Sequence, residues 1–163
     1  MKKKDIIRYI IVFLVIVIID QIIKFTILAS FKERVGIMLI GINPKINTGM
    51  ALGLNAGNTK NIIITIVILA LIGNFVVKQR DNIDRKTMYS LCMIAGGGIS
   101  NLIDRFLHGG VVDYIDAIGF PIFNLADVLI VVGWVLLVIY IFRYSINEEN
   151  ETIGEDEDTG GKS

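Results

Sequence analysis

Cysteine and histidine are almost missing from this sequence of 163 residues. It has one of each, Cys92 and His108, together with two prolines and one tryptophan. A lone cysteine excludes a disulfide within the chain, and these two residues are too few for a Cys/His zinc site. The sequence also lacks a Ser/His or Cys/His pattern for nucleophilic catalysis. We therefore expect no cofactor and no metal, and we interpret Cys92 as a buried, inert thiol.

Charged residues are scarce in four long parts of the chain. Apolar residues make up 53% of the sequence, and because that share alone does not prove membrane insertion, their distribution decides. At about 1.5 Å per residue, a helix over each part can cross most or all of a ~30 Å hydrocarbon layer. A backbone in lipid pairs its polar groups within the segment, which favours helices. We predict an all-α membrane protein with four transmembrane helices, over residues 6–28, 62–77, 88–103 and 120–142.

The Lys and Arg residues between the apolar stretches predict the orientation. They flank the first stretch at residues 2–8, fill the connector at residues 78–86 and follow the fourth stretch at Arg143. Short cytoplasmic flanks carry an excess of these residues, so we expect both termini in the cytoplasm. The first outer loop, residues 29–60, also carries four of them, so the bias is clear but not one-sided.

Two further segments have a composition of their own. Residues 43–49, Asn-Pro-Lys-Ile-Asn-Thr-Gly, combine turn residues with short apolar runs such as 37–42, which indicates a small extracytoplasmic β platform in the first outer loop. Residues 148–158 hold seven acids, whereas the chain before them has 15 Lys and Arg against nine acids. We predict a transmembrane domain of residues 1–147 and a disordered acidic cytoplasmic tail of residues 148–163.

Ionisable residues inside the apolar stretches cost about 2.5–3.5 kcal/mol each near the middle of a span, and they usually mark function. In the four-crossing topology they gather toward the outer side. Asp20 and Lys24 are four residues apart and can pair. They also interrupt the first stretch, which argues against a cleaved signal peptide as its alternative interpretation. Glycines 96–98 would let a neighbouring helix approach, and Pro121 suits the first turn of the fourth helix. The other polar residues are Asn101, Asp104, Arg105, Asn124 and Asp127.

Two carboxyl groups, Asp113 and Asp127, point to acid–base chemistry. The loop of residues 111–116 is apolar enough to lie at the membrane surface and delivers Asp113 beside Asp127. Two carboxyl groups in a poorly solvated site do not both ionise easily, so one serves as acid and the other as base in peptide hydrolysis. From this spacing alone, an ion path or a structural pair is the commoner interpretation. Asp116, in the same loop, is interpreted as a solvated surface acid.

Two rival classes of function make different predictions. A transporter or proton channel predicts acids in both leaflets or an internal repeat. A non-enzymatic membrane scaffold needs no acid at Asp113 and would tolerate Asn at position 127. The sequence has no acids in the inner halves of its apolar stretches and no internal repeat, which speaks against transport.

Five short motifs resemble those of the lipoprotein signal peptidase family, also called signal peptidase II. They follow one another in the family's order along residues 6–142. Each motif alone is weak, but five in order on four apolar stretches are specific. The second motif departs from the family, which usually has Ala and an aromatic residue where this chain has Met50 and Leu52. The motifs are Asp20-Gln21 with Lys24, and residues 47–53, 97–105, 111–114 and 123–127.

The resemblance implies an aspartic endopeptidase of the bacterial cytoplasmic membrane, with its active site toward the outer leaflet. It would remove the signal peptide from prolipoproteins whose cysteine carries diacylglycerol, cutting just before that cysteine. Its partners would be these prolipoproteins, membrane lipids and globomycin-type inhibitors, and no nucleic acid. Asp113 and Asp127 would be the catalytic residues. The residues implied to bind substrate or support the site are Asp20, Lys24, Asn47, Gly49, Asn101, Asp104, Arg105 and Asn124.

Overall fold

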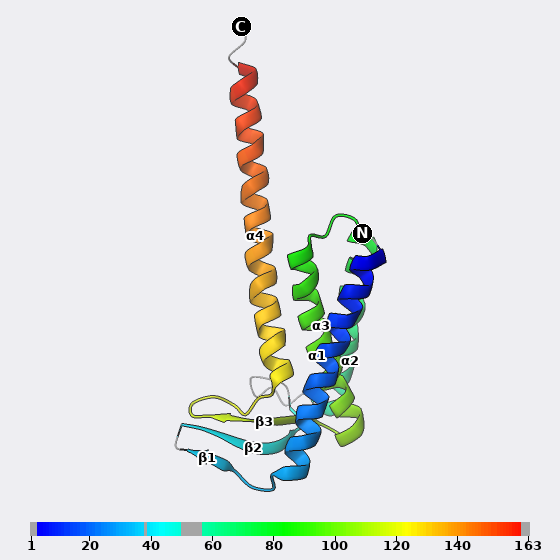
Figure 1. The fold of residues 1–163 in the computed structure, drawn as a ribbon, viewed down its shortest axis with the longest axis vertical. Coiled ribbons are helices and arrows are strands. Elements are labelled where there is room, and N and C mark those ends of the chain that lie inside the picture. Colours follow the sequence, from blue (N-terminus) through cyan, green and yellow to red (C-terminus); the bar gives the residue numbers. More distant parts are fainter. Residues whose placement is uncertain (1–2, 38, 50–56, 161–163) are drawn as a thin grey trace.

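The computed structural model describes residues 3–37, 39–49 and 57–160, with residues 144–160 described by their backbone alone. Its helices stand above a small sheet, and the N-terminus and the far end of α4 both lie at the end away from that sheet (Figure 1). α4 is helical into the acidic segment, where a disordered tail was predicted, and the division into domain and tail stays a prediction. The helices of the described residues are α1 (Lys3–Ser30), α2 (Asn58–Gln79), α3 (Arg85–His108) and α4 (Leu125–Gly160).

The outside of the bundle is apolar. Phe25, Leu71 and Phe142, on three different helices, each leave more than half of their surface exposed. Among the described residues, α1, α2 and the Leu125–Arg143 part of α4 are long and apolar enough to cross a membrane. Soluble monomers rarely expose such continuous apolar surface, so this is a mostly helical membrane protein. α3 covers the predicted third span, but its glycines and polar residues make it less apolar than the other three helices.

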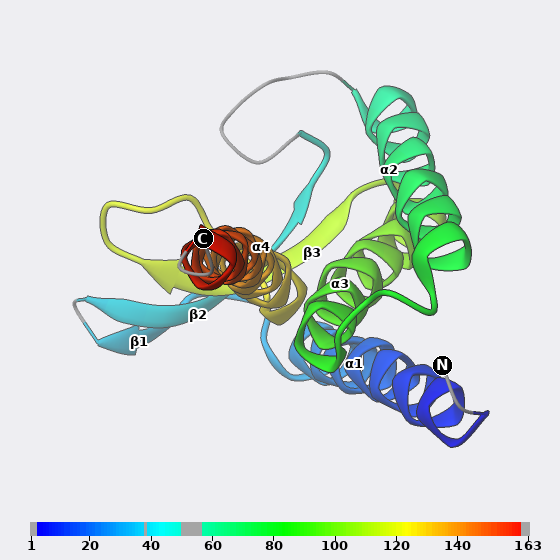
Figure 2. The ribbon, with the colours of Figure 1, turned by 90° about the horizontal axis from the view of Figure 1, so that it is seen from above.

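α3 is the centre of the bundle, because α1, α2 and α4 all pack against it (Figure 2). Two of the three glycines predicted to allow close approach do so. A methyl group at Gly96 would lie 2.8 Å from Cγ2 of Ile16 on α1, and one at Gly97 would lie 2.6 Å from the carbonyl oxygen of Ala126 on α4. Cys92 is buried in the apolar core beside this contact, as predicted.

A three-stranded antiparallel sheet, in the order β1-β2-β3, crosses one end of the described helices. β1 (Val35–Ile37) and β2 (Ile40–Asn47) form the platform predicted in the first outer loop. β3 (Val111–Ala117) was predicted as a surface loop, and it joins the sheet because its backbone pairs with β2. Lys45 lies opposite Asp113, so β2 ends close to that acid. The register is irregular before Lys45, where Pro44 has no amide hydrogen to donate.

α4 begins later than predicted. A helix from residue 120 with Pro121 in its first turn was expected, but α4 starts at Leu125. The backbone of Phe123 is committed to a β-bridge with Ile115, in which each residue's N–H donates to the other's carbonyl, over 3.1 and 2.8 Å. Pro121 therefore lies in the connection between β3 and α4. This late start places Asp127 in the first turn of the helix, next to the sheet.

Candidate active site

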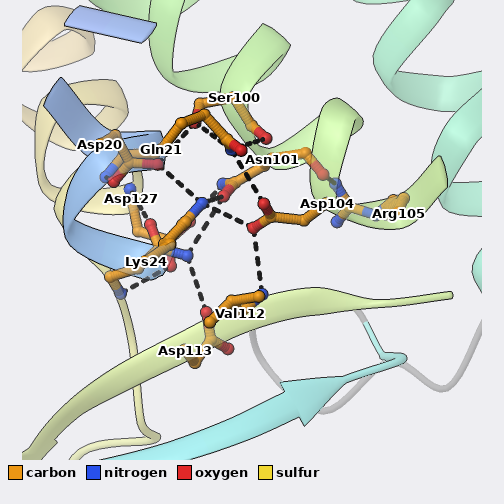
Figure 3. A network of polar contacts seen from close by, with 12 residues as sticks. Asp20, Gln21, Lys24, Ser100, Asn101, Asp104, Arg105, Val112, Asp113 and Asp127 are labelled. Carbon is orange, nitrogen blue, oxygen red and sulfur yellow. Dashed lines mark hydrogen bonds and ion pairs between the residues drawn. The ribbon is translucent and has the colours of Figure 1, made fainter. Parts of the chain in front are cut away.

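A buried ammonium group, Lys24 on α1, lies at the centre of the polar network in Figure 3. Its Nζ atom lies 2.7 Å from Asp20, 2.7 Å from Asp104 and 2.9 Å from Oδ1 of Asn101. Lys24 is 2% exposed, and Asp20 is completely buried. An ammonium group has three N–H donors, so these acceptors replace the water that Lys24 loses. The predicted pairing of Asp20 with Lys24 is confirmed, and Asp104 joins it.

Asn101 on α3 connects this ammonium group to Asp127. Lys24 only donates hydrogen bonds, so Asn101 turns its carbonyl oxygen toward Lys24 and its amide nitrogen away. That nitrogen donates to Oδ1 of Asp127 over 2.8 Å. The side-chain oxygen Oδ1 of Asn101 also accepts a hydrogen bond from Nδ2 of Asn124 over 3.1 Å. The charge of Lys24 thereby fixes the orientation of the Asn101 amide, and with it the direction of the hydrogen bonds to Asp127 and Asn124.

The first turn of α4 holds Asp127 by a capping box. Oδ1 of Asn124 accepts from the backbone N–H of Asp127 over 2.9 Å, and Oδ2 of Asp127 accepts from the backbone N–H of Asn124 over 3.3 Å. The backbone N–H of Ala126 donates to Oδ1 of Asp20 over 2.9 Å. Amide hydrogens at the start of a helix have no partner within it, so both acids satisfy groups that would otherwise be buried and unpaired.

Asp113 on β3 lies between two side-chain amides. Nδ2 of Asn124 donates to its Oδ1 over 2.7 Å, and Nδ2 of Asn47 donates to its Oδ2 over 2.8 Å. The backbone N–H of Gly49 donates to the amide oxygen of Asn47 over 2.9 Å, which fixes the amide's orientation. Burial raises the pKa of Asp113 to about 6; hydrogen bonds from Asn47 and Asn124 oppose this rise, and the charge of Asp127 adds to it.

Asp113 and Asp127 both line a cavity of about 850 Å³ between α2, α3 and α4. Arg105 is on the same wall, where its guanidinium group donates to the backbone carbonyl oxygen of Asn101 over 3.2 Å. Away from the two acids the cavity lining becomes apolar. The side chains of this lining are Ile68 and Leu69 on α2, Ile94 on α3, and Ile130, Val131 and Trp134 on α4.

The ten site residues expected from the sequence all lie among the described residues, either in the hydrogen-bonded network or on the cavity wall. Asp116 forms a surface ion pair with Arg34 over 2.6 Å, in keeping with the solvated acid predicted. Met50 and Leu52, the departures in the second motif, lie outside the described residues. Among the described residues, no cluster of His, Cys, Asp or Glu is suited to a metal ion.

The predicted site residues left out two members of the network, although both lie within the motifs. The hydroxyl group of Ser100 donates to Asp20 over 2.6 Å, and the side-chain amide of Gln21 donates to Asp104 over 2.9 Å. A signal for Ser100 was present, because it precedes Asp104 by four residues and so shares its helix face. Gln21 follows Asp20 directly, and only the position of α3 shows that it also points into the network.

The chain is similar to known proteins over most of its length. The model of the family described as signal peptidase (SPase) II matches residues 12–143. The lipoprotein signal peptidase of Syntrophomonas wolfei is 38% identical over 143 residues, which cover 84% of this chain and 94% of that protein. The one from Staphylococcus aureus is 34% identical over 148 residues, covering 85% and 90%.

A solved structure of a bacterial membrane enzyme has the same fold. It superimposes with a TM-score of 0.78 at 31% identity, covering 86% of this chain and 90% of that one. The family match extends from α1 into α4 and therefore includes all the helices and strands that supply the network. The chain belongs to the signal peptidase II family.

Proposed function

We propose that this protein is an intramembrane aspartic endopeptidase that removes the signal peptide from diacylglyceryl-modified bacterial prolipoproteins. The observation that carries the proposal is the position of Asn124. Its side chain and backbone bind Asp113 and Asp127 at once, so that one residue holds two carboxyl groups on the wall of one cavity. The relatives' names, lipoprotein signal peptidase, support the class of substrate.

In the proposed reaction, Asp127 is the base and Asp113 the acid. Asp127 lies in the first turn of α4, where a helix favours negative charge, so we assign it the ionised role and Asp113 the protonated one. Burial raises the pKa of Asp113, which is compatible with a group that carries a proton. Asp127 removes a proton from water, and the hydroxide attacks the scissile carbonyl while Asp113 protonates its oxygen. The C–N bond then breaks as Asp127 gives its proton to the amine nitrogen and one hydroxyl group of the intermediate returns a proton to Asp113. A carboxylic acid and a free amine remain, and both aspartates regain their starting states.

The shape of the cavity supports a lipid-modified substrate. Its polar wall surrounds the two acids, and its apolar lining continues between α2 and α4, where acyl chains or an apolar signal peptide would lie. We infer four transmembrane helices, with α3 shielded by the others, and both termini in the cytoplasm. The N-terminus and the far end of α4 share the end opposite the sheet, which supports this topology (Figure 1). The site would then face the outer leaflet, where globomycin-type inhibitors would occupy the same cavity.

The position of the acids disfavours a proton path. The buried acids of the described residues, Asp20, Asp104 and Asp113, belong to one network beside the sheet. A relay across the membrane needs ionisable groups at successive depths.

The proposal is tested with purified full-length protein in detergent and two forms of one precursor, with and without diacylglycerol on the cysteine. We expect cleavage of the modified form alone, and mass spectrometry should show a product that begins with the modified cysteine. Asp113→Asn should abolish cleavage while the protein stays folded. No cleavage of either form, or an unchanged rate for Asp113→Asn, would overturn the proposal.

A further inference from the structure

We propose that Ser100 is a positioning residue: its hydroxyl group holds Asp20 against the first turn of α4 and thereby fixes Asp127. This inference rests on the proposed role of Asp127 and assigns a task to a residue outside the predicted site. Ser100 is completely buried on α3, where it contacts Asp20 and Gln21 of α1 (Figure 3). It does not line the cavity, so it has no direct contact with a substrate there.

The hydrogen bonds of Ser100 have a defined direction. Its Oγ lies 2.6 Å from Oδ2 of Asp20 and 2.9 Å from Nε2 of Gln21. The amide nitrogen of Gln21 only donates, so it gives a hydrogen to Ser100 and leaves the hydroxyl hydrogen for Asp20. A short O–H···O contact to a carboxylate belongs to the stronger class of hydrogen bonds. Ser100 therefore binds Asp20 firmly, and Gln21 keeps the hydroxyl turned the right way.

Asp20 connects Ser100 to the first turn of α4. Its Oδ2 accepts from Ser100 and Lys24, which belong to α3 and α1, and its Oδ1 accepts from the backbone N–H of Ala126 on α4. Ala126 directly precedes Asp127. One carboxylate thus joins three helices, and its placement sets where the backbone beside Asp127 lies. Lys24 alone cannot fix Asp20, because a single ammonium group also serves Asp104 and Asn101.

A small error in this position matters for catalysis more than for binding. Displacement of a catalytic group by about 1 Å can lower the rate by about 10²-fold. Because Ser100 lies behind the wall of the cavity, its loss should leave substrate binding unchanged. We therefore expect the effect in kcat and not in KM. A smaller folded fraction would also lower the apparent kcat at constant KM, so kcat is calculated for the folded protein alone, from the folded fraction measured for each variant.

The test compares four variants with the parent protein in the precursor cleavage assay. Ser100→Ala removes the hydroxyl group, Ser100→Cys replaces it with a thiol of similar shape that is a weaker donor, and Ser100→Thr keeps a hydroxyl group. Ser90→Ala is the matched control, because Ser90 is also completely buried on α3 but donates only to the carbonyl oxygen of Lys86 one turn back. We expect kcat about tenfold lower for Ser100→Ala with KM within twofold, a smaller loss for Ser100→Cys, and near-parent values for Ser100→Thr and Ser90→Ala.

Asp127→Asn, measured in the same series, separates this inference from the proposed function. If Asp127→Asn is inactive and folded Ser100→Ala keeps the parent kcat, the positioning role is wrong and the proposed function stands. A rise in KM at constant kcat, or an equal loss for Ser90→Ala, also overturns the role of Ser100. If Asp127→Asn cleaves at the parent rate, both the proposed function and this inference are wrong.

Discussion

Gly97→Ala should damage both the stability and the activity of this protein. The new methyl carbon would lie 2.6 Å from the carbonyl oxygen of Ala126 and 2.8 Å from Cγ1 of Ile130. An ordinary contact is about 3.4 Å or more, so α3 and α4 would have to separate by about 0.8 Å. Overpacking of this kind costs about 1–3 kcal/mol. Because Ala126 precedes Asp127, the same shift moves the proposed base, and we expect kcat to fall by about tenfold or more.

Two measurements on purified protein in detergent check this reasoning. Thermal unfolding should show a lower midpoint for Gly97→Ala than for the parent, and the cleavage assay should show the lower kcat. Gly73→Ala on α2 is the matched control, because a methyl group there meets no atom within 4 Å. If Gly97→Ala matches the parent in both measurements, the close contact between α3 and α4 does not hold Asp127 and the reasoning fails.

The remaining predictions concern the ammonium group, the cap and the titration of the site. Lys24→Met should lower the free energy of unfolding by about 3–5 kcal/mol at pH 7, because it leaves Asp20 and Asp104 buried without a cation; chemical denaturation measures this. Asn124→Ala should lower kcat by about 10²-fold, because it removes the amide that binds the carboxyl group of Asp113 and the oxygen that caps the backbone N–H of Asp127. The free energy of unfolding should fall by only about 1–2 kcal/mol. Raising the pH through about 6 ionises Asp113, so kcat/KM should fall on the alkaline side of an apparent pKa near 6, in a profile from pH 4 to 9.

Each of these predictions has an outcome that contradicts it. Lys60→Met, at an exposed lysine of α2, is the control for Lys24→Met, and equal losses of stability would refute the special position of Lys24. An Asn124→Ala variant that loses stability but keeps its kcat would show that the cap is structural only. A kcat/KM that rises with pH through 6 would assign the base to Asp113 and reverse the two proposed roles.

Much of the site could be predicted because polar residues are conspicuous in apolar helices. Asp20 and Lys24 are one turn apart, and pairing at this spacing needs no tertiary information. The motifs then gave the order in which Asn101, Asp113 and Asp127 follow. The orientation of the side-chain amides could not be predicted from the sequence, because that of Asn101 depends on Lys24, which lies 77 residues earlier in the chain.

The strand β3 and the start of α4 could not be predicted for a related reason. Val111–Ala117 is a short apolar run, which periodicity cannot assign to a strand or to a surface loop. It becomes a strand because β2, from the connection between α1 and α2, offers a partner. Pro121 was a reasonable first residue for a helix, but the bridge between Phe123 and Ile115 competes for that backbone. The first outcome depends on pairing between segments distant in sequence, and the second on a bridge between residues eight positions apart.

The most direct test of the central claim is the turnover of a diacylglyceryl-modified precursor by Asp113→Asn and Asp127→Asn. Asp116→Asn is the matched control, since Asp116 lies on the same strand as Asp113 but pairs with Arg34 at the surface. Two carboxyl groups acting as acid and base predict that both dyad variants are folded and slower by at least about 10³-fold, while Asp116→Asn stays within twofold of the parent. Substantial cleavage by either folded dyad variant would contradict the account.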